Sequence, residues 1–423
     1  MMPSGIWTHE KHPCGEEADR KILIKGEMNM LDLGKLSRQI MEMVRRRQED
    51  IEDYRDKGRE ALEALRGYDE DPSAWMARID SDEHHFFVAF PQGKMQMAYP
   101  LPEEVGAHTV MAVDGSQIEV DTHEITLCYI INIGRVVLHY GTGDKPLLDS
   151  VPTLFYKEED LYREKNGESL LVQGDALTEV RSYMEGKALE ELLDTKRIPS
   201  IPAVVLADGS LVSWDKSASA KKDIGGFTSP HFEGVFRKAE GLGIPVAGYI
   251  SGSRSSLVIH TLRAKDCTQQ VMNCSICPYR LDRQAPCRRL DGIRDTLLFE
   301  NILKPGERST VFYGGINSLE RKDWPKYRIG FFFVHVGQEI ARVEAPDYVL
   351  ERKELLDLLH RVVYDQAQKG MGYPIALKEA HHFAVDKGAE RDLFFDLVEK
   401  QFGRAGVPSA VTPKKLRKQT RIF

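Results

Sequence analysis

Two short segments of the sequence end in the same three residues, Asp-Gly-Ser. They are V-M-A-V-D-G-S-Q at 110–117 and A-V-V-L-A-D-G-S-L at 203–211. Each is an apolar run containing β-branched residues that stops at a glycine, which is typical of a buried strand. We therefore expect Asp114 and Asp208 at the carboxyl ends of neighbouring strands, where open α/β sheets bind their ligands.

Two carboxylates held close together repel each other unless a cation lies between them. A divalent metal ion bound by carboxylate oxygens is the natural partner of such a pair. Each Asp-Gly-Ser is by itself also a good turn, in which Asp and Ser bond to the local backbone. Because the phrase occurs twice, each time after a buried-type strand, the sequence favours a shared metal site over two unrelated turns.

Two further segments supply side chains of the right type. In V-R-S-Y-M-E-G-K-A-L, Arg181 and Glu185 are four residues apart and so share one helix face, although such a pair is also a common surface ion pair. In G-Y-P-I-A-L-K-E-A-H-H-F, a helix carrying His381 and His382 follows a Tyr-Pro step. Adjacent helix residues point about 100° apart, so at most one of the two histidines can face a given site.

Cleavage of a phosphodiester would give these groups a use. The reaction needs an activated water, an in-line geometry and stabilisation of the negative charge that builds up. Two divalent ions about 4 Å apart supply all three. Holding them takes three or four oxygen or imidazole ligands that converge from different elements, as these segments would provide.

The elements between the candidate residues predict how these are brought together. The run 125–140 is expected to form two strands joined near Gly134, which with 110–117 makes an antiparallel meander. A polar loop at 141–167 follows. The remaining expected elements are helix 170–193, strand 203–211, helix 231–241, strand 245–250, strands at 310–313 and 329–336, and two C-terminal helices. This order predicts an α/β protein with a ribonuclease H-like mixed sheet flanked by helices.

Taken together, these segments resemble the NurA nuclease family, which is similar in fold to ribonuclease H. The resemblance spans about residues 105 to 400, with the motifs in the family's order. The matching residues are Asp114-Gly115-Ser116 after the first strand, Arg181 and Glu185 as Arg-x-x-x-Glu, Asp208 to Leu211 as the second Asp-Gly-Ser-Leu, Arg342-Val343-Glu344-Ala345-Pro346 as Arg-Val-Glu-x-Pro, and Tyr373-Pro374 followed by Ala380-His381.

The resemblance implies roles for single residues. Asp114, Glu185 and Asp208 would bind Mn²⁺ or Mg²⁺, and His381 would complete the catalytic site as a ligand or proton shuttle. His382 has no counterpart and would pack or support. The candidate substrate-binding residues are Arg181, Tyr249 and Arg254. Arg254 could grip a phosphate with its planar fork or be an ordinary surface arginine beside a Ser-rich turn.

The resemblance also implies partners. Members of the family are metal-dependent DNases that resect 5′ ends and cut single strands, as homodimers docked on HerA, a hexameric DNA-pumping ATPase. This sequence has no G-x-x-x-x-G-K-S/T motif, so it would need a HerA-like motor in trans. The expected function is DNA end resection in repair or defence. The alternatives are a non-catalytic, metal-binding subunit of a translocase complex and a nuclease that acts on RNA or hybrids.

A cysteine cluster departs from the family's pattern. Cys267, Cys274, Cys277 and Cys287 give the spacing C-x6-C-x2-C-x9-C. Four such thiolates can hold a [4Fe–4S] cluster or Zn²⁺, or remain unliganded, and neighbouring prolines favour iron–sulfur slightly. The surroundings are basic, so the segment could staple the fold or grip the DNA backbone. The arginines concerned are Arg280, Arg283, Arg288, Arg289 and Arg294.

Length and composition set the frame for these motifs. The 423 residues are 42% hydrophobic and 29% charged, which is ordinary for a soluble globular protein. No apolar stretch approaches the ~20 residues of a membrane span, and the N-terminus does not resemble a secretion signal, so we expect a cytoplasmic protein. The net charge of −7 gives no general attraction to nucleic acid, so DNA contacts must come from local basic patches.

The chain is expected to have three parts. Residues 1–104 form an N-terminal extension with a long charged helix at 31–68, which would pack on a second subunit, on a partner or across its own domain. Residues 105–402 form the nuclease domain with the cysteine insert at 265–290. Residues 403–423 are a basic tail, which is either solvated or in contact with a phosphate or partner.

Overall fold

The computed structural model describes residues 32–79, 87–120, 126–165, 167–213, 227–228, 230–279, 281–282, 284–315, 326–385 and 388–406. Residues 407–423 of the basic tail lie outside these ranges. The chain divides into two compact units, Met1–Arg55 and Asp56–Phe423. Helix α1 (Leu33–Glu70), where a helix over 31–68 was expected, begins in the first unit and ends in the second. No helix in the described part of the chain is long and apolar enough to cross a membrane.

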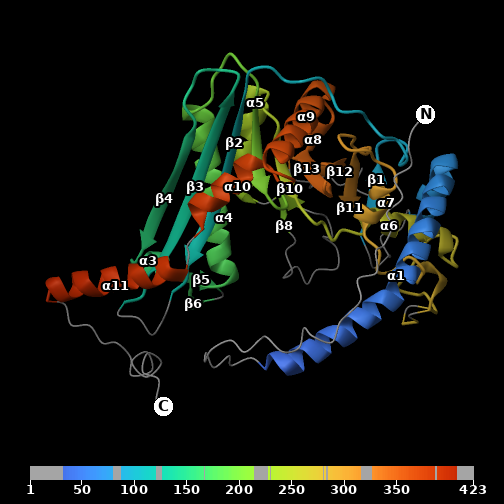
Figure 1. The fold of residues 1–423 in the computed structure, drawn as a ribbon, viewed down its shortest axis with the longest axis horizontal. Helices are drawn as coiled ribbons and strands as arrows, with labels where there is room; N and C mark the ends of the chain where they lie inside the picture. Colours follow the sequence, from blue (N-terminus) through green and yellow to red (C-terminus); the bar gives the residue numbers. More distant parts are fainter. Residues whose placement is uncertain are drawn as a thin grey trace, which may run out of the picture. The chain divides into compact units, whose positions relative to one another are not determined.

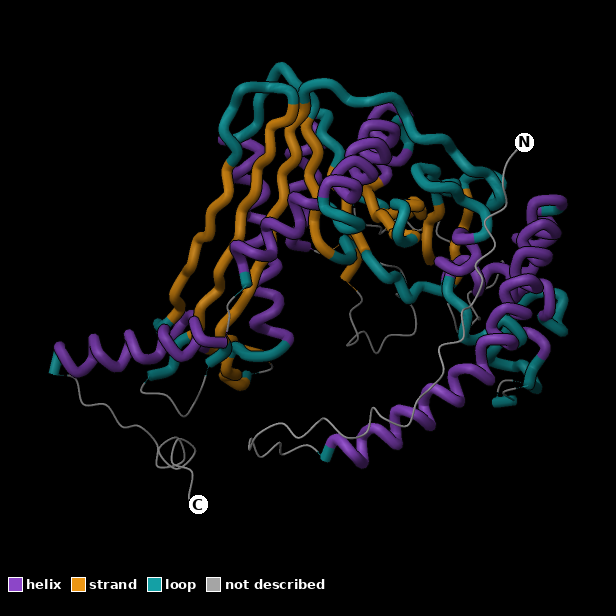
Figure 2. The backbone as a smooth tube through the Cα atoms, viewed as in Figure 1, coloured by secondary structure: helices purple, strands orange, loops and turns teal. Residues whose placement is uncertain are grey.

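The second unit is built on one mixed sheet of nine strands (Figures 1 and 2). Its two central pairings, β2 with β7 and β7 with β10, are parallel, and all the others are antiparallel. The order across the sheet is β1 (Val88–Pro91), β11 (Phe312–Gly315), β12 (Ile329–His335), β13 (Ile340–Pro346), β10 (Val246–Ile250), β7 (Ala203–Asp208), β2 (His108–Ile118), β3 (Tyr129–Tyr140) and β4 (Leu147–Phe155). The predicted mixed α/β architecture is confirmed.

The meander differs from the sequence prediction in two ways. The run 125–140 does not turn at Gly134, because β3 is one strand that pairs with β2 throughout. The third strand is β4, within the segment predicted as a polar loop. Gly134 is needed for packing instead: a Cβ there would overlap the carbonyl oxygen of Ala380 in helix α10 (Ile375–Ala384).

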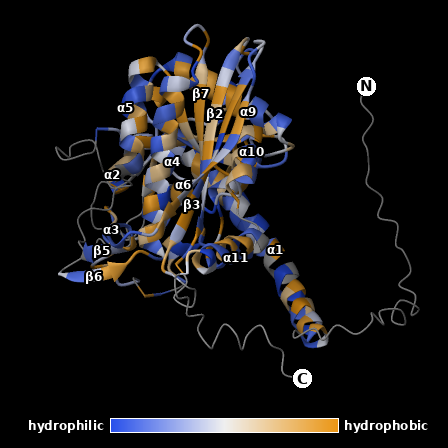
Figure 3. Cartoon of the chain, turned by 90° about the vertical axis from the view of Figure 1, so that its left-hand side faces the viewer, coloured by the Kyte–Doolittle hydropathy of each residue, from blue (hydrophilic) through white to orange (hydrophobic). Residues whose placement is uncertain are grey.

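Helices cover both faces of the central strands (Figure 3). Helix α4 (Asp175–Thr195) faces Gly115 of β2, whereas α10 faces Gly134 of β3. Gly134 is the cross-strand partner of Asp114, and such partners point to the same face of a sheet. Gly115, one residue on, points to the other face. Helices α4 and α5 (Glu233–Leu242) therefore cover one face, and α10 covers the other.

Two hydrophobic cores stabilise the sheet. The larger one is formed by β2, β3, β7 and β10 with α4, α5, α9 (Lys353–Lys369) and α10. The smaller one joins β1, β11 and β12 to the end of α1, where Leu65 is fully buried. The other elements are α2 (Pro72–Ile79), α3 (Glu158–Leu161), β5 (Tyr162–Lys165), β6 (Glu168–Leu171), β8 (Val212–Ser213), β9 (Phe227–Thr228), α6 (Leu257–Leu262), α7 (Asp295–Glu300), α8 (Asp347–Leu350) and α11 (Gly388–Arg404).

Candidate active site

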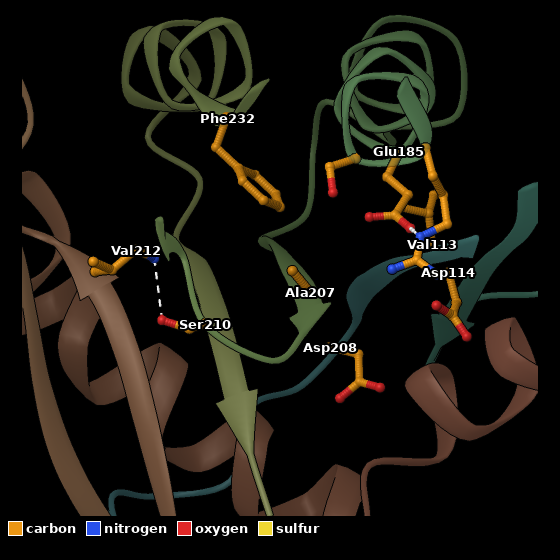
Figure 4. Close-up of a pocket in the computed structure, with 10 residues that line it drawn as sticks. Val113, Asp114, Glu185, Ala207, Asp208, Ser210, Val212 and Phe232 are labelled. Carbon is orange, nitrogen blue, oxygen red and sulfur yellow. Dashed lines mark hydrogen bonds and ion pairs between the residues drawn. The ribbon is translucent and has the colours of Figure 1, made fainter. Parts of the chain in front are cut away.

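Asp114 and Asp208 lie side by side in the sheet. The parallel pairing of β2 with β7 runs up to Val113 and Ala207, so the next residue on each strand is the aspartate. Strand β7 ends at Asp208. Strand β2 continues beyond Asp114 to Ile118, and its residues 115–118 pair with β3 alone. The sheet therefore has a gap next to the two carboxylates, beyond the end of β7 and beside residues 115–118 of β2, which we call the notch. Figure 4 shows both aspartates leaving neighbouring strands, with Glu185 approaching from a helix.

His381 is the partner of Asp114. Its Nδ1 lies 2.7 Å from Asp114 Oδ2, and its side chain is 60% exposed, so the imidazole can exchange protons with solvent. The helix that carries it is fixed at its C-terminal end, where Asn132 Nδ2 and Ser116 Oγ both donate hydrogen bonds to the carbonyl of Ala384. His382 is exposed, and its ring centroid lies 6.4 Å from that of His381.

Tyr373 is the partner of Asp208, a contact that the sequence analysis did not assign. Burial and the neighbouring Asp208 carboxylate, to which Tyr373 is hydrogen-bonded, raise the pKa of its phenol, so the phenol stays protonated and donates. The ring of Tyr249 packs edge-on against it at 5.4 Å. Tyr249 is fully buried and donates to Glu339 Oε1 at 3.0 Å, so it supports Tyr373 from behind and is not open to solvent.

Glu185 reaches the notch from the opposite face. Burial, opposed by the Arg181 guanidinium and reinforced by the Asp114 and Asp208 carboxylates, raises the pKa of Glu185 to about 7. Gly115 makes room for it, because a Cβ at that position would lie 2.5 Å from Glu185 Oε1 and 2.7 Å from Arg181 Cγ. The two aspartates are therefore close enough to influence the ionisation of Glu185.

Arg181 lies beside Glu185, as the sequence spacing predicted. Its Nε is 3.4 Å from Glu185 Oε1 and makes no hydrogen bond within the described part of the chain, although it is buried. The side chain as a whole is 32% exposed. Since Arg181 also lines the cavity described next, its guanidinium is suited to bind a phosphate oxygen there.

A cavity of about 310 Å³ adjoins these groups. Carboxylates and Arg181 line its polar side, the hydroxyls of Ser182 and Ser210 add further polar atoms, and Val212 and Phe232 line its apolar side (Figure 4). A space of this kind combines charged groups that suit a phosphate with an apolar wall that suits a flat ring.

The donor set fits a hard divalent cation. It consists of carboxylate oxygens and one imidazole, and the pKa of Glu185 is raised by burial and further by the charges of Asp114 and Asp208, which a cation would offset. The ligands are not gathered in advance: among the described residues no three His, Cys, Asp or Glu side chains are grouped so that they could hold one ion. Asp114 and Asp208 lie toward α10, and Glu185 lies toward α4.

Arg254, the remaining substrate-binding candidate, follows β10. It is exposed, and no hydrogen bond or ion pair joins it to another residue in the ranges that the structure describes. The next residue, Ser255, accepts a backbone hydrogen bond from Asp295 at 2.9 Å. Arg254 is therefore held at the surface by an ordered backbone, with its guanidinium available.

The four cysteines lie within one irregular segment, between residues 267 and 287. All four are partly exposed, and in the part of the chain that the structure describes no three of them form a group that could hold a metal. The segment is held through its backbone, because Arg78 Nη2 donates to the carbonyl of Cys267 and Arg263 Nε donates to that of Cys287, both at 2.5 Å. Of the nearby arginines, Arg289 pairs with Glu60 at 2.6 Å, and Arg280 and Arg283 lie outside the described residues.

Comparison with known proteins follows from this geometry. The family model of the NurA domain matches residues 108–386, which include every carboxylate of the site and His381. The solved structure of the NurA nuclease from Sulfolobus solfataricus is similar, with 12% identity, a TM-score of 0.41, and coverage of 79% of this chain and 93% of that one. A second NurA structure has 11% identity and a TM-score of 0.36, and the match covers 85% of this chain and 97% of that one. No curated protein sequence matches. Because the domain match covers more than half of the chain, this protein belongs to the NurA domain family.

Proposed function

We propose that the protein is a divalent-metal-dependent deoxyribonuclease. The observation that carries the proposal is the pair of aspartates on adjacent parallel strands, Asp114 within β2 and Asp208 at the end of β7, whose charges add to burial in raising the pKa of Glu185. Carboxylates so placed would hold Mn²⁺ or Mg²⁺. When bound, such ions supply an activated water and stabilise the charge on the leaving 3′-oxygen.

The chain's own residues have distinct tasks in this proposal. Asp114, Asp208 and Glu185 are the ligands, and His381 orients Asp114 and holds or releases a proton at Nδ1. Tyr373 fixes the orientation of Asp208 through its phenol. Arg181 binds a phosphate of the substrate beside the ligands, and Arg254 binds one farther along the strand.

We also propose that the core is ribonuclease H-like, and the order and direction of the strands support this. The antiparallel meander β2–β3–β4 is followed by parallel strands β7 and β10, and the first strand of each group carries a candidate ligand. In such a core the ligands collect where neighbouring strands end. We propose 5′-3′ exonuclease action, single-strand cutting or both, in DNA end resection for repair or defence in the cytoplasm.

The proposed partners are DNA, a second copy of the chain and a HerA-like hexameric ATPase. In the first unit, the described part of α1 carries exposed apolar side chains at Ile40, Met41, Met43 and Val44. Exposed apolar side chains grouped on a charged helix are typical of a surface that docks on another protein. Within the predicted helix 31–68, loss of residues 31–55, which spares the buried end of α1 in the second unit, is therefore expected to abolish dimerisation or binding of the ATPase.

We also propose that Cys267, Cys274, Cys277 and Cys287 bind a [4Fe–4S] cluster or Zn²⁺. The support is their spacing and their confinement to one segment whose backbone is anchored at Cys267 and Cys287. Binding would have to draw the thiols together. Its main effect would be to staple this segment, with DNA contact by nearby arginines as a second effect.

Cleavage of end-labelled DNA tests the proposed nuclease. Linear duplex and single-stranded DNA, with RNA and hybrid in parallel, are incubated with Mn²⁺, Mg²⁺ or EDTA. Wild type should cleave DNA only with the metal, and Asp114→Ala and Asp208→Ala should be inactive. Asp144→Ala, which removes an exposed carboxylate from a loop, is the matched control. A wild type that stays inert even with the cognate ATPase would leave the protein as a binding subunit, and preferential RNA cleavage would change the substrate.

A further inference from the structure

The turn that follows Asp208 is held by one buried carboxylate. Glu344 Oε2, on strand β13, accepts hydrogen bonds from Ser210 Oγ at 2.7 Å and from the backbone N–H of Leu211 at 3.0 Å. Glu344 is separated from this turn by more than 130 residues in the chain. The side chain of Glu344 thus fixes Ser210 and Leu211, which follow the candidate metal ligand Asp208 closely in the chain.

The turn has little freedom on its other side. Gly209 has a positive φ of 87°, which favours glycine, and its N–H donates to the carbonyl of Tyr249 at 2.9 Å. Gly248 of β10 lies against it, because a Cβ there would overlap the carbonyl oxygen of Gly209. The turn is therefore held between β10 and Glu344. A shift of Glu344 would move the turn and, with it, the adjoining Asp208.

Glu344 is held in turn by Arg342 of the same strand. Glu344 is 2% exposed and Arg342 6% exposed, so both charges are removed from water. Arg342 Nε and Nη2 lie 3.0 and 2.8 Å from Glu344 Oε1, and the guanidinium stacks on the Phe331 ring at 3.6 Å. A buried carboxylate needs such a partner, since a lone buried charge is strongly destabilising.

The chain of contacts continues toward the cysteine segment. Arg342 Nη1 donates to Ser255 Oγ at 3.1 Å, and Ser255 Oγ donates to Asp295 Oδ2 at 2.7 Å. Asp295 is fully buried, and its Oδ1 accepts from the backbone of Ile259 at 3.0 Å. The four linked side chains are three charged groups and one hydroxyl, and they join α6 and α7 to the turn after Asp208.

We propose that Glu344 is a positioning residue for Asp208, and that Arg342, Ser255 and Asp295 hold it in register. This inference rests on the proposed function of Asp208 as a metal ligand. A buried ion pair adds little stability compared with apolar residues of the same shape, so its value here lies in orientation. Groups that orient metal ligands typically change metal affinity or activity about 10- to 100-fold when they are removed.

Ser210 offers the mildest test, because it is exposed and its loss leaves the Glu344–Arg342 pair intact. We expect Ser210→Ala to weaken Mn²⁺ binding and to lower kcat by about tenfold, with KM for DNA unchanged. Ser210→Thr keeps the hydroxyl and should retain both values. Thr195→Ala, which removes an exposed hydroxyl bonded to the carbonyl of Glu191, is the matched control. Manganese affinity is measured by electron paramagnetic resonance, and folding by thermal melting.

Glu344→Gln gives the second arm. It keeps the shape and one acceptor but removes the charge, and we expect a larger loss of Mn²⁺ affinity per folded molecule than in Ser210→Ala. If both variants bind Mn²⁺ and cleave DNA like wild type, or lose only melting temperature, Glu344 is structural and the proposal fails. If wild type itself neither binds Mn²⁺ nor cleaves, the proposed function fails instead, so the two failures are distinguishable.

Discussion

Asp114 Oδ2 and His381 Nδ1 lie 2.7 Å apart although 267 residues separate them in the chain. The contact depends on one glycine and two hydrogen bonds: Gly134 lets α10 approach the sheet, and Asn132 and Ser116 both donate to the carbonyl at its C-terminal end. The imidazole is exposed, whereas the carboxylate is mostly covered. Both aspartate oxygens are oriented, because Oδ2 contacts His381 and Oδ1 accepts a hydrogen bond from the backbone N–H of Gly115 at 2.8 Å.

Replacement of His381 tests whether this residue orients Asp114 and transfers a proton or only contributes to folding. We expect His381→Ala to lower kcat by about 100-fold or more, because a positioned acid or base contributes on that scale, with KM for DNA little changed. Steady-state cleavage of labelled DNA measures both constants. His382→Ala removes the neighbouring exposed imidazole and should stay within about twofold of wild type. Equal losses in the two variants would argue against a specific role of His381.

The raised pKa of Glu185 predicts a pH-dependent stability of the metal-free protein. The folded state binds this proton more tightly than the unfolded state, with a pKa of about 7 against 4.5. The stabilisation is therefore complete below pH 4.5 and is lost as the pH rises through 7, by an amount of order 3 kcal/mol.

The measurement is denaturant unfolding in EDTA between pH 5 and about 8. Glu185→Gln cannot ionise at this position, so its free energy of unfolding should fall less over that range than that of wild type. Parallel curves for the two proteins would show that Glu185 does not titrate with a raised pKa. Adding Mn²⁺ should narrow the difference if Glu185 is a ligand, since a bound cation favours the ionised carboxylate.

Gly115→Ala should damage the site with one methyl group. The new Cβ would meet Glu185 Oε1 at 2.5 Å and displace it together with Arg181. We expect cleavage to fall at least tenfold, as a displacement of about 1 Å near the reacting atoms can cost 100-fold. Gly241→Ala is the control, because its Cβ would meet nothing within 4 Å on helix α5. Retention of activity in Gly115→Ala would show that Glu185 can relax without loss.

Metal analysis of cysteine variants tests the proposed thiolate site. Protein purified without oxygen should contain either about four iron atoms with sulfide or one zinc per chain. Cys277→Ser should lose that metal and melt at a lower temperature, because a structural metal contributes directly to folding. Cys128→Ser, at a buried thiol outside the segment, should keep the metal. Wild type without bound metal, or a Cys277→Ser variant that retains it, would refute the site.

The sequence predicted the parts of the fold that local patterns determine. Asp114 and Asp208 were found because each ends an apolar run, and the parallel pairing of those runs places them together. Strand β4 was missed because it is an edge strand whose side chains are largely exposed, with a proline at position 152, so it lacks the apolar signal of a strand. Gly134 was taken for a turn because its real role, the approach of α10, is set by a helix almost 250 residues away.

The sequence predicted the candidate metal ligands but not the residues that orient them. Tyr373 and Glu344 were recognisable as parts of motifs, yet their contacts with Asp208 and its turn depend on long-range packing that no local spacing encodes. Tyr249 was expected near substrate, and its complete burial follows from its central position between β7 and β13. Physical supports of a site are the features least visible in a single sequence.

The position of β13 and α10 after all three candidate ligands in the sequence has a consequence for synthesis. A growing polypeptide would present Asp114, Glu185 and Asp208 to the cell well before Glu344 and His381 had been made. Because the turn after Asp208 is fixed by β13 and Asp114 is oriented by α10, the constellation is complete only after both elements have left the ribosome. The order of translation thus keeps a partly synthesised copy from assembling its site.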